Sequence, residues 1–131
     1  MKRHGLLNAP LATLIAELGH TDTFVIADAG LPIPLDVQRI DLAVTANLPL
    51  FLDVLRAVLA EMQVERAIIA AEMETTSPEM YRALRSLLGD IPVQTLSHED
   101  FKTRSANARA IVRTGEFTPY ANVILVAGVV F

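Results

Sequence analysis

Residues 24–34 read FVIADAGLPIP, and this stretch decides how the chain folds. Its first four residues form a short apolar run, which is typical of a strand buried on both faces in an α/β protein. Gly30, Pro32 and Pro34 then force a loop directly after Asp28. The stretch therefore predicts a buried strand that ends at a carboxylate and continues into a rigid turn.

Apolar runs of the same kind recur along the chain, with helical segments between them. Residues 67–71 (AIIAA) predict a second buried strand, which ends at Glu72. Further strands are expected at 39–44, 93–96, 110–112 and 123–130. Helices are expected at 8–18, 49–59 and 78–88 and after Ser97. The residues that mark helix starts are Asn8, Ser77 and Ser97. This alternation predicts an α/β fold, a three-layer α/β/α sandwich.

The last two predicted strands bear on the direction of the sheet. A short loop without a helix joins them, whereas parallel neighbours need a long crossover. We therefore expect a mixed, mostly parallel sheet in one domain that spans residues 1–131.

Composition limits the classes of protein. Hydrophobic residues make up 52% of the chain and its mean hydropathy is +0.40, which favours a homo-oligomer whose subunits cover part of one another's surface. The net charge of −4, without a basic cluster, argues against nucleic acid as a partner. No apolar stretch reaches the ~18 residues of a membrane helix and no secretion signal is apparent, so we expect a cytoplasmic protein.

Two histidines are candidates for proton transfer. His20 follows the helix expected to end at Gly19, where the helix dipole and Asp22 both favour a protonated ring that could act as a general acid. Alternatively, it caps the carbonyls at the helix end. His98 follows Ser97 at the positive end of a helix, beside two acidic residues that act in the opposite direction. It could bind a hydroxyl group or simply be an exposed first-turn residue.

Hydroxyl-binding groups accompany these histidines. Asp28 could accept hydrogen bonds from sugar hydroxyls or cap the turn that follows it. Tyr120 and Asn122 would leave the same face if their segment is extended, and otherwise form an edge strand and a turn. Asp28, Glu72 and Asn122 stand at predicted strand ends, where α/β folds commonly bind ligands.

Several strong motifs are absent from the sequence. It contains neither a phosphate-binding G-x-x-x-x-G-K-[ST] loop nor a G-x-G-x-x-G loop, which disfavours nucleotide chemistry. It also lacks cysteine, histidine pairs at helical spacing and a G-x-S-x-G elbow, so thiolate, serine-hydrolase and metal chemistry are not indicated.

Long runs of residues resemble those of the D-ribose pyranase family, which is related to the L-fucose mutarotases. The matching runs are 4–8 (HGLLN), 18–22 (LGHTD), 27–34 (ADAGLPIP), 96–102 (LSHEDFK) and 113–122 (RTGEFTPYAN). The chain differs from the family pattern at Asn47, where a glycine is expected, and at Glu74, where a lysine is common.

The resemblance implies an activity and a set of roles. It implies an α/β/α fold assembled as a decamer of two stacked pentameric rings, with sites near subunit contacts and without a metal or organic cofactor. His20 corresponds to the proton donor, and Asp28, His98, Tyr120 and Asn122 correspond to sugar-binding groups. The implied reaction interconverts the pyranose and furanose forms of D-ribose. Mutarotation of L-fucose or another aldose, or a non-catalytic sugar-binding ring, are the alternatives.

Overall fold

A computed structural model describes all residues 1–131, which form a six-stranded sheet with helices on both faces. The strands are β1 (Thr23–Ala27), β2 (Gln38–Asp41), β3 (Val64–Ala70), β4 (Val93–Leu96), β5 (Ala110–Arg113) and β6 (Val123–Ala127). The helices are α1 (Ala9–Glu17), α2 (Phe51–Leu59), α3 (Glu72–Thr76), α4 (Pro78–Leu88) and α5 (His98–Ser105). None of them is long and apolar enough to cross a membrane.

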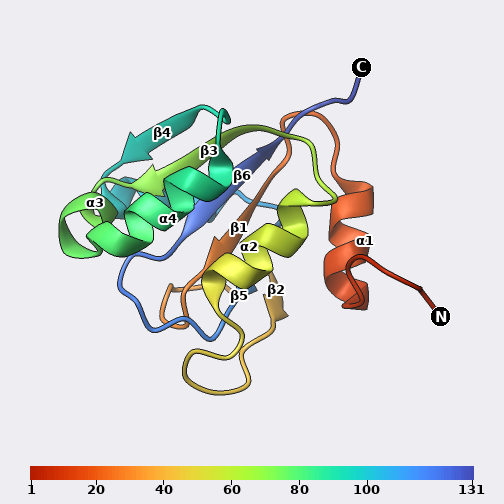
Figure 1. Cartoon of the computed structure of the whole chain (residues 1–131), viewed down its shortest axis with the longest axis horizontal. Helices are drawn as coiled ribbons and strands as arrows, with labels where there is room; N and C mark the ends of the chain where they lie inside the picture. Colours follow the sequence, from red (N-terminus) through yellow and green to blue (C-terminus); the bar gives the residue numbers. More distant parts are fainter.

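The sheet is mixed and mostly parallel, as predicted. Its strand order is β2-β5-β1-β6-β3-β4, and β6 lies antiparallel between β1 and β3 (Figure 1). The remaining pairs, β2–β5, β5–β1 and β3–β4, are parallel. β5 and β6 are not neighbours, because β1 lies between them.

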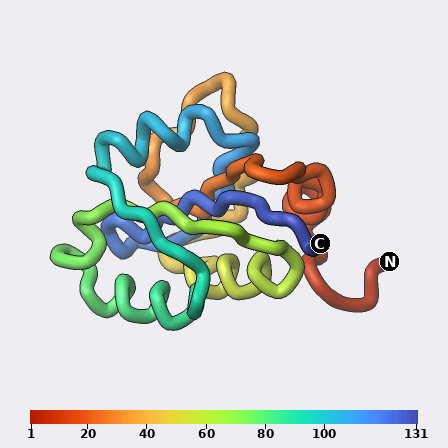
Figure 2. The backbone as a smooth tube through the Cα atoms, turned by 90° about the horizontal axis from the view of Figure 1, so that it is seen from above, coloured from red at the N-terminus to blue at the C-terminus, as the bar shows by residue number.

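Helices cover the two faces unequally, and the three-layer prediction is confirmed (Figure 2). α1, α2 and α4 pack on one face over a core that includes Phe24, Phe51 and Leu84. On the other face, α5 and the 31–37 loop cover a smaller core around Phe101 and Ile111. The central strands β1 and β6 are almost entirely inaccessible to solvent, which explains their continuous apolar sequences, whereas the edge strands β2 and β4 are partly exposed.

Several element boundaries differ from those predicted. β2 ends at Asp41 instead of residue 44, because the Asp41 carboxylate accepts the Ala43 N–H and turns the chain away from the sheet. α3 is a short helix that apolar periodicity does not indicate, and β6 ends at Ala127 instead of residue 130.

The predicted helix starts at Asn8, Ser77 and Ser97 are confirmed, with one difference in their chemistry, whereas α2 begins at Phe51 and not at residue 49. Asn8 and Ser97 cap α1 and α5 by accepting the N–H groups of Leu11 and Asp100. α4 begins after Ser77 as predicted, but the Ser77 hydroxyl donates to the Pro119 carbonyl at 2.7 Å instead of capping the helix.

Candidate functional site

One edge of the sheet gathers most of the candidate residues. The parallel strands all end there, and β6 begins there because it runs in the opposite direction. Asp28, Glu72, His98 and Asn122 follow or precede these strand ends within two residues. The expected cluster at the strand ends is therefore present, and His98 after β4 belongs to it.

Asp28, His98 and Tyr120 line one small cleft at this edge. Gly30, Leu31, Pro32 and Pro119 complete its walls, and its volume is about 250 Å³. Three side chains that can exchange hydrogen bonds with hydroxyl groups thus meet around a space of small-molecule size.

Asn122 lies behind this cleft and holds Asp28. Its amide oxygen accepts the Asp28 N–H at 2.8 Å, and its amide nitrogen donates to Asp28 Oδ2 at 2.9 Å. Asp28 Oδ1 accepts the Gly30 N–H at 2.9 Å, so the carboxylate also caps the turn. Since Asn122 is fully buried, its contact in this chain is with Asp28.

The segment around Tyr120 is a turn and not an extended strand. Tyr120 has a φ of 63°, a left-handed conformation that is rare for an aromatic residue, and its carbonyl accepts the Asn122 N–H at 2.8 Å. The two side chains therefore do not leave the same face, as they would in an extended segment. Tyr120 lines the cleft, whereas Asn122 is buried.

His98 packs against Tyr120 at the start of α5. Their ring centroids lie 4.9 Å apart with the planes at 80°, an edge-to-face arrangement. The Nδ1 atom of His98 is buried and has no hydrogen-bond partner in the chain. His98 is thus a half-buried wall of the cleft and not an exposed first-turn residue.

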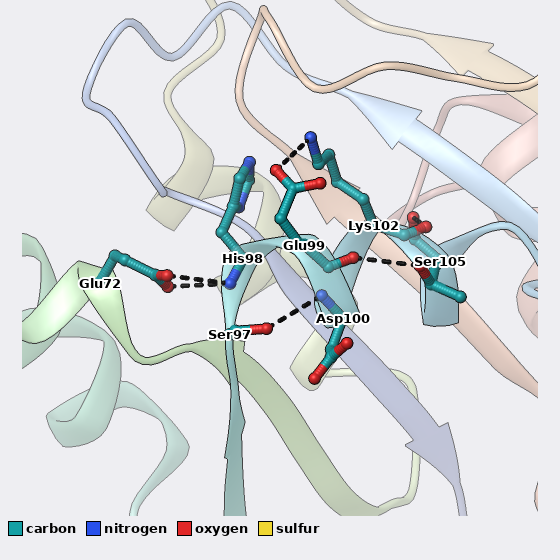
Figure 3. Close-up of polar contacts among 8 residues, drawn as sticks. Glu72, Ser97, His98, Glu99, Asp100, Lys102 and Ser105 are labelled. Carbon is teal, nitrogen blue, oxygen red and sulfur yellow. Dashed lines mark hydrogen bonds and ion pairs between the residues drawn. The ribbon is translucent and has the colours of Figure 1, made fainter.

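Glu72, the first residue of α3 after the neighbouring strand β3, supports His98, a contact that the sequence does not predict. Both of its carboxylate oxygens accept the His98 N–H, at 3.1 and 2.9 Å (Figure 3). The hydrogen bond from the His98 N–H holds the pKa of the Glu72 carboxyl below its ordinary value. The backbone N–H of Glu72 itself and the charge of His98 also lower this pKa, whereas partial burial raises it. The position of Glu72 at a strand end was the available signal.

The run 113–118 makes structural hydrogen bonds in this chain. Buried Glu116 accepts the Phe51 N–H at 3.1 Å and so caps α2, whose own N-cap position is a leucine, and it also accepts the Thr118 hydroxyl. Arg113 donates to the Ala29 carbonyl at 3.0 Å. Together with the Ala29 N–H, which donates to the Glu116 carbonyl at 2.9 Å, the Arg113 bond fixes the loop that follows β5 against the turn that carries Asp28.

His20 lies at the opposite edge of the sheet from this cleft. It precedes β1, its side chain is 52% exposed, and its Nε2 atom is 2.6 Å from Glu65 Oε2. The acidic neighbour of His20 is therefore Glu65 and not the expected Asp22, whose carboxylate accepts the Gly19 N–H. Within one chain, the structure brings Asp28, His98, Tyr120 and Asn122 together and leaves His20 apart.

Lys102, on the same helix as His98, is held in an ion pair. The Lys102 ammonium pairs with Glu99 at 2.7 Å, one turn along α5 from His98 (Figure 3). The chain contains no group of three histidine or acidic side chains placed to hold a metal ion.

Comparisons with known proteins agree over the full chain. The model of the RbsD / FucU transport protein family matches residues 1–130. A curated D-ribose pyranase from Coprothermobacter proteolyticus is 55% identical over 131 residues, which is all of both chains. The structure of Bacillus subtilis RbsD complexed with D-ribose superposes with a TM-score of 0.97 at 50% identity and full coverage of both chains. The Streptococcus pneumoniae fucose mutarotase complexed with L-fucose gives a TM-score of 0.80 at 28% identity, over 99% of this chain and 100% of the other.

Proposed function

The chain belongs to the RbsD/FucU family, and on that premise we propose that it interconverts the pyranose and furanose forms of D-ribose, as an intramolecular isomerase. Its full-length identity of 55% to the curated D-ribose pyranase from Coprothermobacter proteolyticus is about twice its identity of 28% to the fucose mutarotase structure. The observation that carries the proposal is the cleft in which Asp28, His98 and Tyr120 meet. These groups match the several hydroxyls of a pentose.

The reaction requires two proton movements. A proton is delivered to the ring oxygen while the anomeric hydroxyl loses its own, and the bond between the anomeric carbon and the ring oxygen breaks to give the open-chain aldehyde. The hydroxyl on C4, in place of the one on C5, then attacks the aldehyde carbon. The attacking hydroxyl loses its proton, and the aldehyde oxygen gains one to become the new anomeric hydroxyl. General acid–base catalysis of this type typically contributes ~10²–10⁴-fold.

Each candidate residue has a role in this scheme. His20 is the proton donor, Asp28 and Tyr120 bind sugar hydroxyls, and His98 forms the wall beside Tyr120. Asn122 contributes by holding Asp28. The base is His98, Tyr120 or a bound water. Holding the open chain in the cleft favours the second ring closure.

The site is complete only when two subunits meet, because His20 and Asp28 lie at opposite edges of the sheet. Apolar side chains are exposed beside both. Val130 and Phe131 flank the cleft that contains His20. Phe117 borders Asp28 and adjoins the exposed loop that carries Val44 and Leu48. A second copy of the chain would cover these residues and remove them from water.

A contact between two different faces of the same chain generates a ring when its rotation closes. This geometry supports the ring assembly that the family resemblance implies, and we propose a decamer of two stacked pentamers. We place the protein in the cytoplasm, where imported ribose must become a furanose before a kinase can phosphorylate it.

The test is NMR saturation transfer on ribose at equilibrium, run with a panel of aldoses. Catalytic amounts of the protein are expected to accelerate pyranose–furanose exchange of D-ribose more than anomer exchange of L-fucose. Faster exchange for L-fucose would favour the mutarotase alternative. Saturable binding of ribose without any change in its exchange rate would show a non-catalytic sugar-binding ring.

A further inference from the structure

Glu72 and His98 occupy equivalent places after two paired strands. Ala70 of β3 pairs with Leu96 of β4, and the Ala71 N–H donates to the Leu96 carbonyl at 2.7 Å. Glu72 and His98 each follow two residues after this pair. The register of the sheet therefore places the Glu72 carboxylate against the His98 N–H, although the two residues are 26 positions apart (Figure 3).

The imidazole of His98 has no polar support of its own. Nδ1 is buried without a partner, and the ring is held by packing between Tyr120 at 4.9 Å and Phe101 at 6.4 Å. A ring held by packing alone keeps its orientation only while its main chain stays in place. The hydrogen bonds to Glu72 fix that main chain.

We propose that Glu72 is a positioning residue of the sugar site: by accepting the His98 N–H, it holds the His98 imidazole against Tyr120 at the wall of the cleft. This inference rests on the proposed function, in which that cleft binds ribose. Glu72 does not line the cleft, so its effect on the sugar passes through His98.

Glu72 could also act only by stabilising the start of α5. A substitution at Ser97 distinguishes this role from positioning of the His98 ring. The Ser97 hydroxyl accepts the Asp100 N–H at 3.1 Å, and its carbonyl accepts the Phe101 N–H. Ser97→Ala therefore weakens the same end of the same helix but leaves the contact between Glu72 and His98 intact. It is a matched control for Glu72→Ala.

The experiment measures KM and kcat for ribose exchange with Glu72→Ala, Glu72→Gln and Ser97→Ala, together with the NMR signals of the His98 ring. Glu72→Ala is expected to raise KM about tenfold, as loss of one net hydrogen bond to a charged group implies. The value of kcat should stay near wild type if Tyr120 or a water is the base and should fall if His98 is the base. Glu72→Gln keeps an acceptor oxygen and should restore most of the affinity. Ser97→Ala should lower the melting temperature without changing KM.

Three outcomes would overturn the inference. They are a wild-type KM in Glu72→Ala, equal KM values for Glu72→Ala and Ser97→Ala, or a failure of Glu72→Gln to restore the affinity. If Glu72→Ala does not fold, the NMR signals of the His98 ring test the inference. They should stay near their wild-type positions in Glu72→Gln. They should move in Glu72→Asp, because the shorter side chain draws the carboxylate away from the His98 N–H. Unmoved signals in Glu72→Asp would then overturn it.

Failure of the proposed function has a different signature. A wild-type protein that does not accelerate ribose exchange contradicts the function, whatever the Glu72 variants do. A wild-type protein that accelerates exchange, combined with an unaltered KM in Glu72→Ala, contradicts only the positioning role.

Discussion

His20 and Asp28 lie at opposite ends of the same strand. β1 has five residues, Thr23–Ala27, so it alone separates the two side chains by about 17 Å. A proton donor must approach the reacting oxygen to hydrogen-bonding distance, roughly 3 Å. One subunit therefore cannot apply both residues to the same sugar, and the proposed reaction requires a contact between subunits.

Replacing His20 tests its role as proton donor. His20→Ala is expected to lower the rate of ribose exchange by about 10²–10⁴-fold, the usual contribution of general acid catalysis. His4→Ala is the control, because it removes an exposed histidine at the other end of α1. Saturation transfer with ribose measures both. Exchange by His20→Ala at the wild-type rate would rule out the assignment.

Removing the Asn122 amide tests its hold on Asp28. Asn122→Ala removes a fully buried amide and leaves the N–H and one carboxylate oxygen of half-buried Asp28 without their partner. The free energy of unfolding is expected to fall by about 1–3 kcal/mol, and ribose should bind more weakly because Asp28 loses its fixed orientation. Urea unfolding and ribose titration measure these effects.

Asn107→Ala is the matched control, since Asn107 is exposed and its side chain makes no hydrogen bond in the chain. Equal stability and ribose affinity in Asn122→Ala and Asn107→Ala would show that the buried pair does not matter.

Glu116 should matter for stability. Glu116→Ala removes the acceptor for the Phe51 N–H at the start of α2, where Leu50 offers no side-chain cap. The expected loss is about 0.5–2 kcal/mol, as for other helix caps, measured by urea unfolding. Glu74→Ala removes the same charge from an exposed position and should be nearly neutral. A loss for Glu74→Ala as large as that for Glu116→Ala would contradict the capping role.

The lowered pKa of Glu72 predicts a pH dependence. The His98 N–H favours the ionised carboxyl in the folded protein, so this stabilisation is fully present above the ordinary glutamate pKa of about 4.3. It is lost as the pH falls through the lower pKa of the folded state. Because Glu72→Gln removes this titration, the difference in melting temperature between wild type and Glu72→Gln should be largest near neutral pH and shrink in acid. A difference that grows on acidification would contradict the assignment.

Most of the fold could be predicted from local patterns. The buried strands β1 and β3 appear as continuous apolar runs, and the caps Asn8 and Ser97 are standard helix starts. α3 could not be predicted in this way, since it has only five residues and a single buried side chain, Met73. Its position depends on the pairing of β3 with β4.

The sequence indicates the candidate site residues but not their arrangement. Asp28, His98, Tyr120 and Asn122 lie at one edge of the sheet, whereas His20 lies beside Glu65 at the other edge. That Asn122 contacts Asp28 depends on the antiparallel pairing of β6 with β1, and the turn at Tyr120 depends on a left-handed residue that no local rule demands. The strand order likewise puts Glu65, and not Asp22, beside His20.

The most direct test of the central claim is complementation between two inactive variants. His20→Ala and Asp28→Ala proteins are unfolded together, refolded as an equal mixture, and assayed for ribose exchange. If each site takes His20 from one subunit and Asp28 from another, random assembly restores about a quarter of the sites and thus about a quarter of the wild-type activity. A mixture that remains as inactive as its separate components, although the two chains co-assemble, would contradict a site shared between subunits.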